Sequence, residues 1–482
     1  MLFRRTKIVA TLGPATDNPA VLDKLIEAGV DVVRLNFSHD IADVHFRRAE
    51  LARARALAHG RQVGVLVDLQ GPKIRIGKFI KKKIILEEGR KFVLDINWPL
   101  DKGNEERVGI TYQSLPRDVS PGTTLLLNDG RIILGVEQVA GGEVICRVVV
   151  GGELSDNKGV NRQGGGLTAR ALTDKDREDI KAAAAMNADY LGVSFPRNAK
   201  DIEEARSLLR AAGGKGGIVA KIERAEAITA IEEIIAASDV IMIARGDLGV
   251  EIGDAALPPV QKRIINLARR MNRVVITATQ MMESMIENTI PTRAEVSDVA
   301  NAVLDGTDAV MLSAETASGK YPVAAVAAMD RVCREAEKHE ETAYSRQRID
   351  THFERVDEAI AMAVIHIANH LPVKAIAALT ESGSTALWIS RMTSAVPIYA
   401  LTRHVETCRK VTLYRGVQPV IFDFESNDPA QVMREALGEL RKRGAVHDGD
   451  LAILTIGEPL AKPGGTNAIK IVRVEDFTAS AD

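Results

Sequence analysis

Eight short apolar segments, most of them separated by helical patterns, constrain the fold of this chain more than any other feature. They begin near Thr6, Asp31, Gln62, Ala188, Gly217, Asp239, Arg273 and Asp308. Amphipathic helical patterns lie between them, for example at Ala20–Glu27, His45–His59, Asp176–Met186 and Lys200–Leu209. Apolar runs that alternate with helices are typical of parallel strands buried on both faces. Eight such units, roughly 25 to 35 residues apart, predict an α/β chain with a (β/α)8 barrel of the TIM type. A doubly wound open sheet is the alternative.

Two of the helical segments carry more detailed predictions. Thr292 to Glu295 forms a capping box just after Pro291, which predicts a helix that starts there and ends at Gly306. The segment Ala225–Ala237 predicts one amphipathic helix between the strands that begin near Gly217 and Asp239.

The interval between the third and fourth apolar runs is roughly 95 residues too long for one βα unit. Between Pro72 and Gly166, helical periodicity disappears and β-rich segments alternate with turn signals. These segments are Lys83–Leu86, Lys91–Leu94, Thr124–Leu127, Arg131–Leu134 and Val144–Val150, with turns at Asn128–Gly130 and Ala140–Glu143. They predict an all-β barrel domain inserted into a loop of the (β/α)8 barrel. Glycine-rich segments flank it at Gln70–Pro72 and Gly164–Gly166, which indicates a hinged lid over the barrel mouth.

A second α/β pattern follows the polar stretch Glu337–Arg355. Its strand-like runs are Lys374–Leu379, Val396–Leu401, Gln418–Phe422, Leu451–Ile456 and Ala468–Val474. We therefore expect a barrel domain over 1–71 and 167–342, a lid over 72–166 and a C-terminal α/β domain over 343–482. The first βα turn of the last domain offers hydroxyls and amides that suit an effector phosphate, from Thr380, Ser382, Ser384 and Thr385. An ordinary helix cap is the alternative.

The composition excludes several classes of protein. A net charge of −2 with 27% charged residues argues against a basic nucleic-acid binder, and 4% aromatic residues argue against base-stacking platforms. Three distant cysteines (Cys146, Cys333 and Cys408) indicate a reducing compartment and no zinc site. No run has the length of a membrane span, and no signal-peptide core follows the basic start. We expect no membrane partner and a cytoplasmic location.

Barrel enzymes carry their active sites at the carboxyl ends of the strands. The fifth strand of this chain ends in Lys221 and Glu223, and the sixth ends before Asp247. A lysine and two carboxylates on one rim indicate a divalent metal beside a stabilising cation, with a structural salt bridge as the alternative. The other strand ends contribute Arg34, Asn36, Ser38, His39, Asp68, Lys73, Arg75, Ser194, Thr279 and Glu315. This set favours metal-assisted phosphoryl transfer or metal-assisted enolate chemistry.

Eight stretches of the chain resemble the pyruvate kinase family, in the same order and over essentially the whole length. They are KIVATLGPAT, VVRLNFSH, VDLQGPKIRIG, NKGVN, the KIE of the fifth strand, ARGDLG, TATQMMESM and SAETASGKYP. Each alone is a weak signal, and together they are highly specific. The resemblance implies a barrel, an inserted β lid and a C-terminal α/β domain that often carries an effector site, usually in an allosteric homotetramer. It also implies the last step of glycolysis, in which phosphoenolpyruvate and ADP become pyruvate and ATP.

The resemblance further implies roles for residues at the barrel rim. Glu223 and Asp247 match the ligands of Mg²⁺ or Mn²⁺. Lys221 matches the lysine that neutralises the transferring phosphoryl group and the developing enolate. The amides of Gly246 and Asp247 match those that hold the substrate carboxylate.

Further residues complete the site that the resemblance implies. Thr279 matches the threonine implicated in protonating the enolate, and we expect it to relay a proton from a water that Glu315 supports. Phosphate, substrate and nucleotide contacts are expected from Arg34, Arg75, Ser194, Asn36, His39 and Lys158.

One departure from the family pattern concerns the monovalent cation. Many members need K⁺, held at positions that match Asn36, Ser38, Asp68 and Leu69, and here leucine replaces a threonine. Lys73 stands where K⁺-dependent members carry glutamate. A tethered ammonium supplies the charge that the ion would give, so we expect an enzyme that does not require K⁺. A Lys73 that points into solvent is the alternative.

Two other functions compete with this interpretation. A metal-dependent lyase or aldolase acting on pyruvate enolate would share Glu223 and Asp247, but it needs neither a lid nor Lys158 and Arg75. A catalytically silent metabolite sensor on the same fold is the other, and the intact set of rim residues argues against it. The expected effector is a sugar phosphate or a nucleotide, with Arg403 near the same loop.

Overall fold

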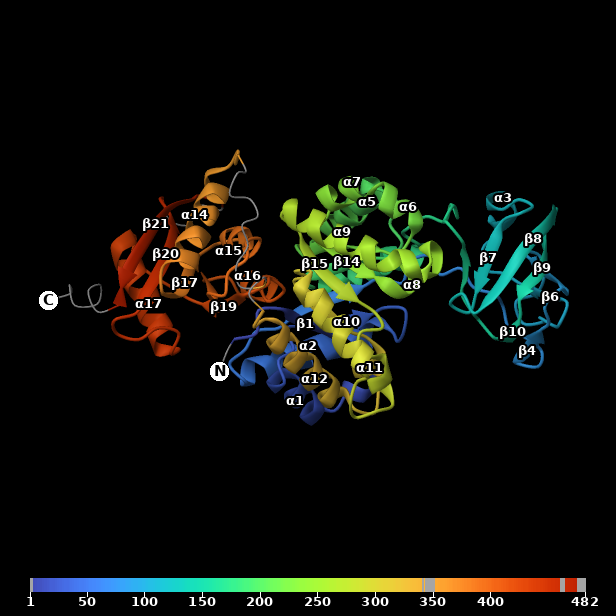
Figure 1. Ribbon diagram of the computed structural model, residues 1–482, viewed down its shortest axis with the longest axis horizontal. Helices are drawn as coiled ribbons and strands as arrows, with labels where there is room; N and C mark the ends of the chain where they lie inside the picture. Colours follow the sequence, from blue (N-terminus) through green and yellow to red (C-terminus); the bar gives the residue numbers. More distant parts are fainter. Residues whose placement is uncertain (1–2, 340–341, 343–351, 460–463, 475–482) are drawn as a thin grey trace.

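The computed structural model describes residues 3–339, 342, 352–459 and 464–474 (Figure 1). At its centre, eight parallel strands close into a barrel in the order β1-β16-β15-β14-β13-β12-β3-β2. They are β1 (Lys7–Thr11), β2 (Val32–Asn36), β3 (Gly64–Asp68), β12 (Tyr190–Val193), β13 (Gly217–Ile222), β14 (Val240–Ala244), β15 (Val274–Ala278) and β16 (Ala309–Leu312). All eight strands predicted from the apolar runs are thus present. The closed barrel rules out the open doubly wound sheet.

Helices surround the barrel because each presents an apolar face to the buried strands. They are α1 (Pro19–Glu27), α2 (Ala42–Ala58), α4 (Asp174–Ala185), α5 (Ala199–Ala211), α6 (Ala225–Thr229), α7 (Ile231–Ala237), α8 (Arg245–Ile252), α9 (Leu257–Arg270), α10 (Arg293–Leu304), α11 (Ala314–Ala317) and α12 (Pro322–Ala336). Short 3-10 turns lie at Pro14–Thr16, Asp254–Ala256 and Glu283–Ile286. The capping box predicted for α10 is confirmed, because Glu295 N donates to Thr292 Oγ1 and Thr292 N donates to the Glu295 carboxylate.

The prediction of one helix over 225–237 is wrong. The segment breaks at Ala230 into α6 and α7. α6 packs against α8, whereas α7 packs against α5 and α9. Two short helices can meet these separate surfaces, and one straight amphipathic helix cannot.

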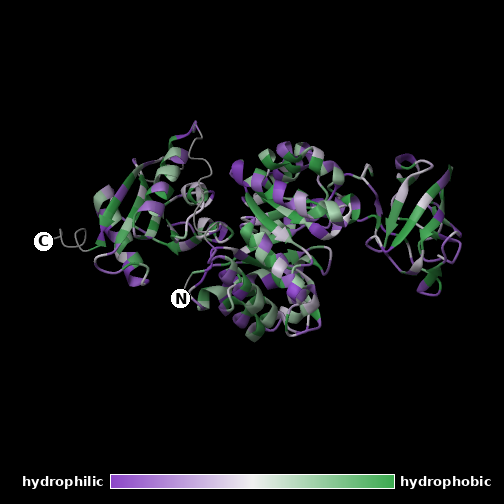
Figure 2. Ribbon diagram, in the orientation of Figure 1, coloured by the Kyte–Doolittle hydropathy of each residue, from purple (hydrophilic) through white to green (hydrophobic). Residues whose placement is uncertain are grey.

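The inserted lid lies at the far right of Figure 1. It contains a sheet in the order β11-β7-β8-β9-β5-β6 and a separate β10–β4 pair. The strands are β4 (Lys83–Leu86), β5 (Lys91–Asp95), β6 (Arg107–Gly109), β7 (Thr124–Leu127), β8 (Ile132–Ala140), β9 (Glu143–Val150), β10 (Gly152–Ser155) and β11 (Val160–Arg162), with one short helix, α3 (Leu115–Asp118). The lid buries a core of its own. Figure 2 shows the hydrophobic residues concentrated on its strands.

The C-terminal domain holds a sheet in the order β19-β18-β17-β20-β21, whose last strand is antiparallel. Its elements are α14 (Val356–His370), β17 (Val373–Leu379), α15 (Ser384–Ser390), β18 (Ile398–Thr402), α16 (Val405–Val411), β19 (Val417–Ile421), α17 (Pro429–Lys442), β20 (Leu451–Gly457) and β21 (Thr466–Arg473). The five predicted strands are confirmed. Most of the predicted polar stretch Glu337–Arg355 lies outside the described residues.

The C-terminal domain packs against the amino-terminal end of the barrel. One continuous core joins Val9 and Val32 of the barrel to Val364 and Ile376 of this domain. The lid lies near the opposite end, so the carboxyl ends of the barrel strands face the lid (Figure 1). No helix among the described residues is long and apolar enough to cross a bilayer.

Candidate active site

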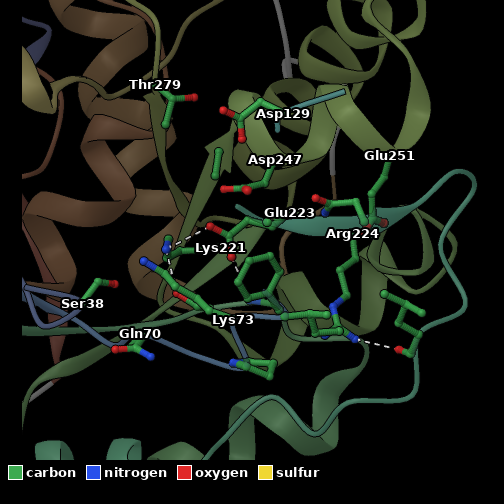
Figure 3. A pocket seen from close by; sticks show the side chains of 18 of the residues that line it. Ser38, Gln70, Lys73, Asp129, Lys221, Glu223, Arg224, Asp247, Glu251 and Thr279 are labelled. Atoms are coloured by element: carbon green, nitrogen blue, oxygen red, sulfur yellow. Dashed lines mark hydrogen bonds and ion pairs between the residues drawn. The ribbon is translucent and has the colours of Figure 1, made fainter. Parts of the chain in front are cut away.

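A polar cavity of about 260 Å³ lies at the carboxyl ends of the barrel strands, beside the root of the lid. Many of the side chains predicted from the strand ends line it. They are Arg34, Asn36, Ser38, Lys73, Arg75, Ser194, Lys221, Glu223, Asp247 and Thr279. Parallel strands in a barrel bring these residues together although they are spread over more than half of the chain. Figure 3 shows Lys221, Glu223, Asp247 and Lys73 directed into this space.

Lys221 is the centre of a buried charge cluster. Its Nζ lies 2.9 Å from Glu223 Oε1 and 3.2 Å from Asp68 Oδ1, and it donates to Ser194 Oγ at 2.7 Å. Asp68 is completely buried below the cavity, where its other oxygen accepts from Arg34 Nε at 2.7 Å. Burial lowers the pKa of Lys221, but Asp68 and Glu223 raise it more, so the net shift is upward. Lys221 therefore carries its positive charge at neutral pH.

Glu223 and Asp247 place two carboxylates on the same side of the cavity. Burial raises the pKa of Glu223 to about 7. Lys221 opposes this rise, and the neighbouring Asp247 adds to it. Burial also raises the pKa of Asp247. Glu223 Oε2 accepts from Phe195 N at 2.8 Å, and no hydrogen bond of the Asp247 carboxylate is found within the described part of the chain. Two carboxylates with raised pKa values, Glu223 buried and Asp247 partly buried, form a site that a hard divalent cation would stabilise.

Thr279 follows β15 in a strained conformation. Its φ is +68°, and Gln280 follows with a φ of +55°. Left-handed backbone is rare for a β-branched residue and costs of the order of 1–3 kcal/mol. The Thr279 hydroxyl accepts from Gly246 N at 2.8 Å and donates to Ala278 O at 2.6 Å. The strain places this hydroxyl at the start of α8, next to the amide expected to bind a substrate carboxylate.

Lys73 and Arg75 enter the cavity from the segment that leads into the lid. Burial, together with the cations of Arg75 and Lys221 and against the carboxylates of Asp247 and Asp68, lowers the pKa of Lys73 to about 8. Arg75 Nη1 donates to Asn157 O at 3.3 Å. Lys73 therefore lines the same cavity as these charged groups, although part of its surface reaches solvent.

Several predicted residues do not line this cavity. His39 is exposed, Lys158 contributes its backbone oxygen to Ile76 N at 3.0 Å, and Leu69 is packed in the barrel core. The Glu315 carboxylate accepts from Ser313 N at 2.7 Å and from Met282 N at 3.2 Å. In this structure Glu315 therefore joins the loops that follow β15 and β16.

The structure adds residues that the sequence patterns did not single out. Asp129 reaches the cavity from the tip of the lid turn, and Glu251 reaches it from α8. Arg224, next to the metal-ligand candidate Glu223, donates to Leu167 O at 3.1 Å and anchors the root of the lid. Asp129 lies within the predicted turn Asn128–Gly130, so the sequence pattern could have identified it. For Glu251 the sequence offers no such signal.

The predicted effector loop lies in the C-terminal domain, beside a small cavity lined by Thr380, Ser384 and Thr385. Thr380 Oγ1 already accepts from Gly383 N at 2.9 Å, and Thr385 Oγ1 lies 2.6 Å from Thr466 Oγ1. Ser382 does not line the cavity; its Oγ donates to Ser384 Oγ at 3.2 Å. Arg403 stacks on Phe424 and faces Glu381.

Comparison with known proteins gives two family matches that together span most of the chain. Residues 3–326 match the family described as "Pyruvate kinase, barrel domain", and residues 358–472 match "Pyruvate kinase, alpha/beta domain". The chain is 55% identical over 477 residues to "Pyruvate kinase II" of Salmonella typhimurium, which covers 98% of this chain and 99% of that protein. It is 54% identical over 476 residues to "Pyruvate kinase" of Buchnera aphidicola, with the same coverage, and 53% identical over 459 residues to "Pyruvate kinase" of Haemophilus influenzae, with 94% and 96% coverage.

Proposed function

Because the chain belongs to the pyruvate kinase family, and is a phosphotransferase of that type, we propose that its cavity transfers the phosphoryl group of phosphoenolpyruvate to ADP without K⁺. The observation that carries the proposal is the arrangement of Lys221 between Glu223 and Asp68, within one cavity that Asp247 and Lys73 also line. We further propose that it works in the cytoplasm, in the last step of glycolysis.

The donor set fits Mg²⁺ or Mn²⁺. Glu223 and Asp247 offer hard carboxylate oxygens, and their pKa values, raised chiefly by burial, show a cost of carrying charge in this cavity that a divalent cation would relieve. When bound, the ion supplies Lewis-acid stabilisation of negative charge on the substrate oxygens. The tests are the variants Glu223→Gln and Asp247→Asn, for which we expect a loss of Mg²⁺ binding in a calorimetric titration together with a loss of turnover.

The cations of the cavity act on the phosphoryl group. The Lys221 ammonium, held in place by its two carboxylate partners, offsets charge as the bond to phosphorus breaks. Arg34, fixed by Asp68 and by Thr11 Oγ1 at 3.0 Å, is oriented for the same phosphate. Arg75, with Asn36, His39 and Lys158, is proposed to contact the nucleotide, and Ser194 the substrate.

The amides of Gly246 and Asp247 are proposed to bind the substrate carboxylate. Gly246 N now donates to Thr279 Oγ1, so an incoming carboxylate competes for that hydrogen bond. The exchange frees an acceptor position on the Thr279 oxygen for a water, and the hydroxyl proton, which is donated to Ala278 O, turns from that carbonyl to the enolate carbon in the relay. Glu315 is proposed to support the relaying water by fixing the two loops around it.

Independence from K⁺ rests on Lys73. Its ammonium shares the cavity with Asp247 and is attracted by Asp247 and Asp68, and the side chain at position 69 is an apolar leucine buried in the core. Asn36 Oδ1 accepts from Ser38 N at 3.1 Å, which engages two of the expected K⁺-ligand positions with each other.

The test is pyruvate formation in tetramethylammonium buffer, with and without added K⁺. We expect full activity without K⁺, and little activity in Lys73→Glu, which K⁺ restores only in part because Leu69 cannot coordinate it. A large activation of the unaltered enzyme by K⁺ would sink the proposal.

Allosteric control and assembly are proposed separately. A sugar phosphate or AMP is proposed to bind at Thr380, Ser382, Ser384 and Thr385, and the adjacent small cavity supports this. In a thermal-shift screen, these ligands should raise the melting temperature, and Ser382→Asp should abolish that rise. An unchanged response in the variant would show that the loop does not bind the effector.

A homotetramer is proposed on the strength of the family, and the apolar groove between α10 and α12 supports a subunit contact. Sedimentation analysis measures the assembly state.

A further inference from the structure

Arg245, the first residue of α8, has no role in the functions assigned above, although it lies between Gly246 and the end of β14. It is almost completely buried, at 7% exposure. Its guanidinium is directed at the backbone of the strained segment that follows β15. We propose that Arg245 is the positioning residue that holds Thr279 in its left-handed conformation and thereby fixes the proton-relay geometry.

The contacts of Arg245 converge on three successive carbonyl groups. Its Nη2 donates to Thr279 O at 2.8 Å and to Gln280 O at 3.3 Å, and its Nε donates to Ala278 O at 3.3 Å and Thr279 O at 3.2 Å. Two consecutive left-handed residues turn these carbonyls toward one side of the backbone. Like dipoles at close range repel, and a buried cation at their focus offsets this repulsion.

A carboxylate on α10 fixes the guanidinium in this position. Asp298 Oδ1 and Oδ2 accept from Arg245 Nη1 and Nη2, each at 2.7 Å, in a bidentate pair. The planar fork of arginine suits this geometry, whereas a lysine ammonium can satisfy only part of it. The chain of contacts therefore runs from α10 through Arg245 to the backbone of Thr279.

A displacement of Thr279 should affect one chemical step, the protonation of the enolate. Transfer breaks the bond between phosphorus and the C2 oxygen of phosphoenolpyruvate, forms a bond between that phosphorus and a terminal phosphate oxygen of ADP, and leaves an enolate. C3 of the enolate then accepts one proton as the C2–O double bond forms, and a proton lost by the Thr279 hydroxyl is replaced from water. Phosphoryl transfer itself depends on Lys221 and the metal ligands. A displaced Thr279 should therefore slow protonation more than transfer.

The proposal rests on the proposed role of Thr279, and the experiment separates the two. Two rates are measured on the Mg²⁺-loaded enzyme: ATP formation from phosphoenolpyruvate and ADP, and exchange of pyruvate methyl protons with D₂O in the presence of ATP, followed by NMR. The variants are Arg245→Lys, the milder Asp298→Asn, and Thr279→Val as a reference. Arg391→Lys is the matched control, because Arg391 is also a buried arginine that binds a carboxylate (Asp308) and a carbonyl (Arg273 O, 2.7 Å), at the opposite end of β15.

We expect Arg245→Lys to lower the ratio of exchange to ATP formation at least about tenfold, Asp298→Asn to lower it less, and Arg391→Lys to leave it unchanged. Equal losses of both rates in Arg245→Lys and in Asp298→Asn would overturn the proposal, because they would indicate a purely structural role. If Thr279→Val leaves the ratio unchanged, the proposed role of Thr279 fails instead. If the ratio of exchange to ATP formation falls in Thr279→Val but is unchanged in both Arg245→Lys and Asp298→Asn, the role of Thr279 stands and the positioning role of Arg245 is refuted.

Discussion

At the scale of single residues, positive and negative side chains of the cavity pair with one another. Asp68 is shared between Arg34 and Lys221, and Glu223 is shared between Lys221 and the amide of Phe195. These four charges are partly satisfied before any ligand arrives. Such an arrangement keeps a buried site folded and leaves its polar groups oriented toward an incoming phosphate.

The lowered pKa of Lys73 predicts how activity without K⁺ depends on pH. Lys73 is protonated below a pH of about 8 and neutral above it, with the cations of Arg75 and Lys221 opposing its charge and the carboxylates of Asp247 and Asp68 supporting it. In tetramethylammonium buffer, kcat/KM for phosphoenolpyruvate should therefore fall as the pH rises through about 8. An initial-rate pH profile of the free enzyme measures it.

The control is Lys73→Arg, whose guanidinium stays charged over the whole range. Its profile should lack this alkaline fall. If both enzymes show the same fall, another group is responsible, and the ammonium of Lys73 does not supply the charge of the missing cation.

At the scale of elements, hydrogen bonds to both a side chain and the backbone of the barrel domain hold the root of the lid. Gly164, Gly165 and Gly166 all have φ between +77° and +98°. Gly166 N donates to the Glu226 carboxylate on α6, and Gly164 N donates to Glu251 O on α8 at 2.9 Å. The break of the predicted helix at Ala230 separates α6, which contacts the lid, from α7, which packs on the barrel.

Two alanine substitutions in this segment should differ in a predictable way. A Cβ at Gly165 would lie 2.5 Å from Glu226 Oε2, whereas a Cβ at Gly164 would meet nothing within 4 Å. Both substitutions carry the strain of left-handed backbone, about 1 kcal/mol. Gly165→Ala should lower the free energy of unfolding more than Gly164→Ala does. It should also raise KM for ADP, because Glu226 must move away from Gly166. Urea unfolding and initial rates measure both effects, and equal behaviour of the two variants would show that the Glu226 contact is unimportant.

At the scale of the whole molecule, the barrel and the C-terminal domain share a core, and the lid does not. Val9 and Ile376 belong to the same apolar cluster, while the lid cluster is separate. Buried polar contacts reinforce the shared interface: Arg391 pairs with Asp308, and Lys7 Nζ donates to Val417 O at 2.6 Å. The lid is joined to the barrel chiefly through its two glycine-containing connections.

This division predicts two separable unfolding transitions. The two tryptophans report on different parts, since Trp98 lies in the lid, under Arg107, and Trp388 lies in α15 of the C-terminal domain. In the single-tryptophan proteins Trp388→Phe and Trp98→Phe, we expect different urea midpoints. Arg391→Met leaves Asp308 buried without its main partner. It should lower the free energy of unfolding that Trp388 reports by about 3–5 kcal/mol.

The Trp98 transition should not respond to Arg391→Met. A common midpoint for both reporters, or an equal shift of both, would mean that the lid unfolds together with the rest of the molecule.

The amino-acid pattern was enough to predict eight βα units, the lid insertion and the order of parts, because burial on both faces of a parallel strand leaves a continuous apolar run. Only the observed closure of the sheet decided between a barrel and an open sheet. The amino-acid pattern also placed Lys221, Glu223 and Asp247 on one rim, since parallel strands end at the same edge. The helix break at Ala230 could not be read, because the apolar positions fit one helix and the two packing surfaces that divide it come from distant elements.

Tertiary structure alone decided which of these rim residues meet. Asp68 and Lys221 are separated by more than 150 residues and meet because β3 and β13 both pair with β12. The left-handed backbone of Thr279, and the arginine whose guanidinium meets its carbonyls, depend on the packing of α8 and α10 against the end of β15. Local sequence encodes which residue types stand at the strand ends, and long-range packing fixes their distances, their charges and their strain.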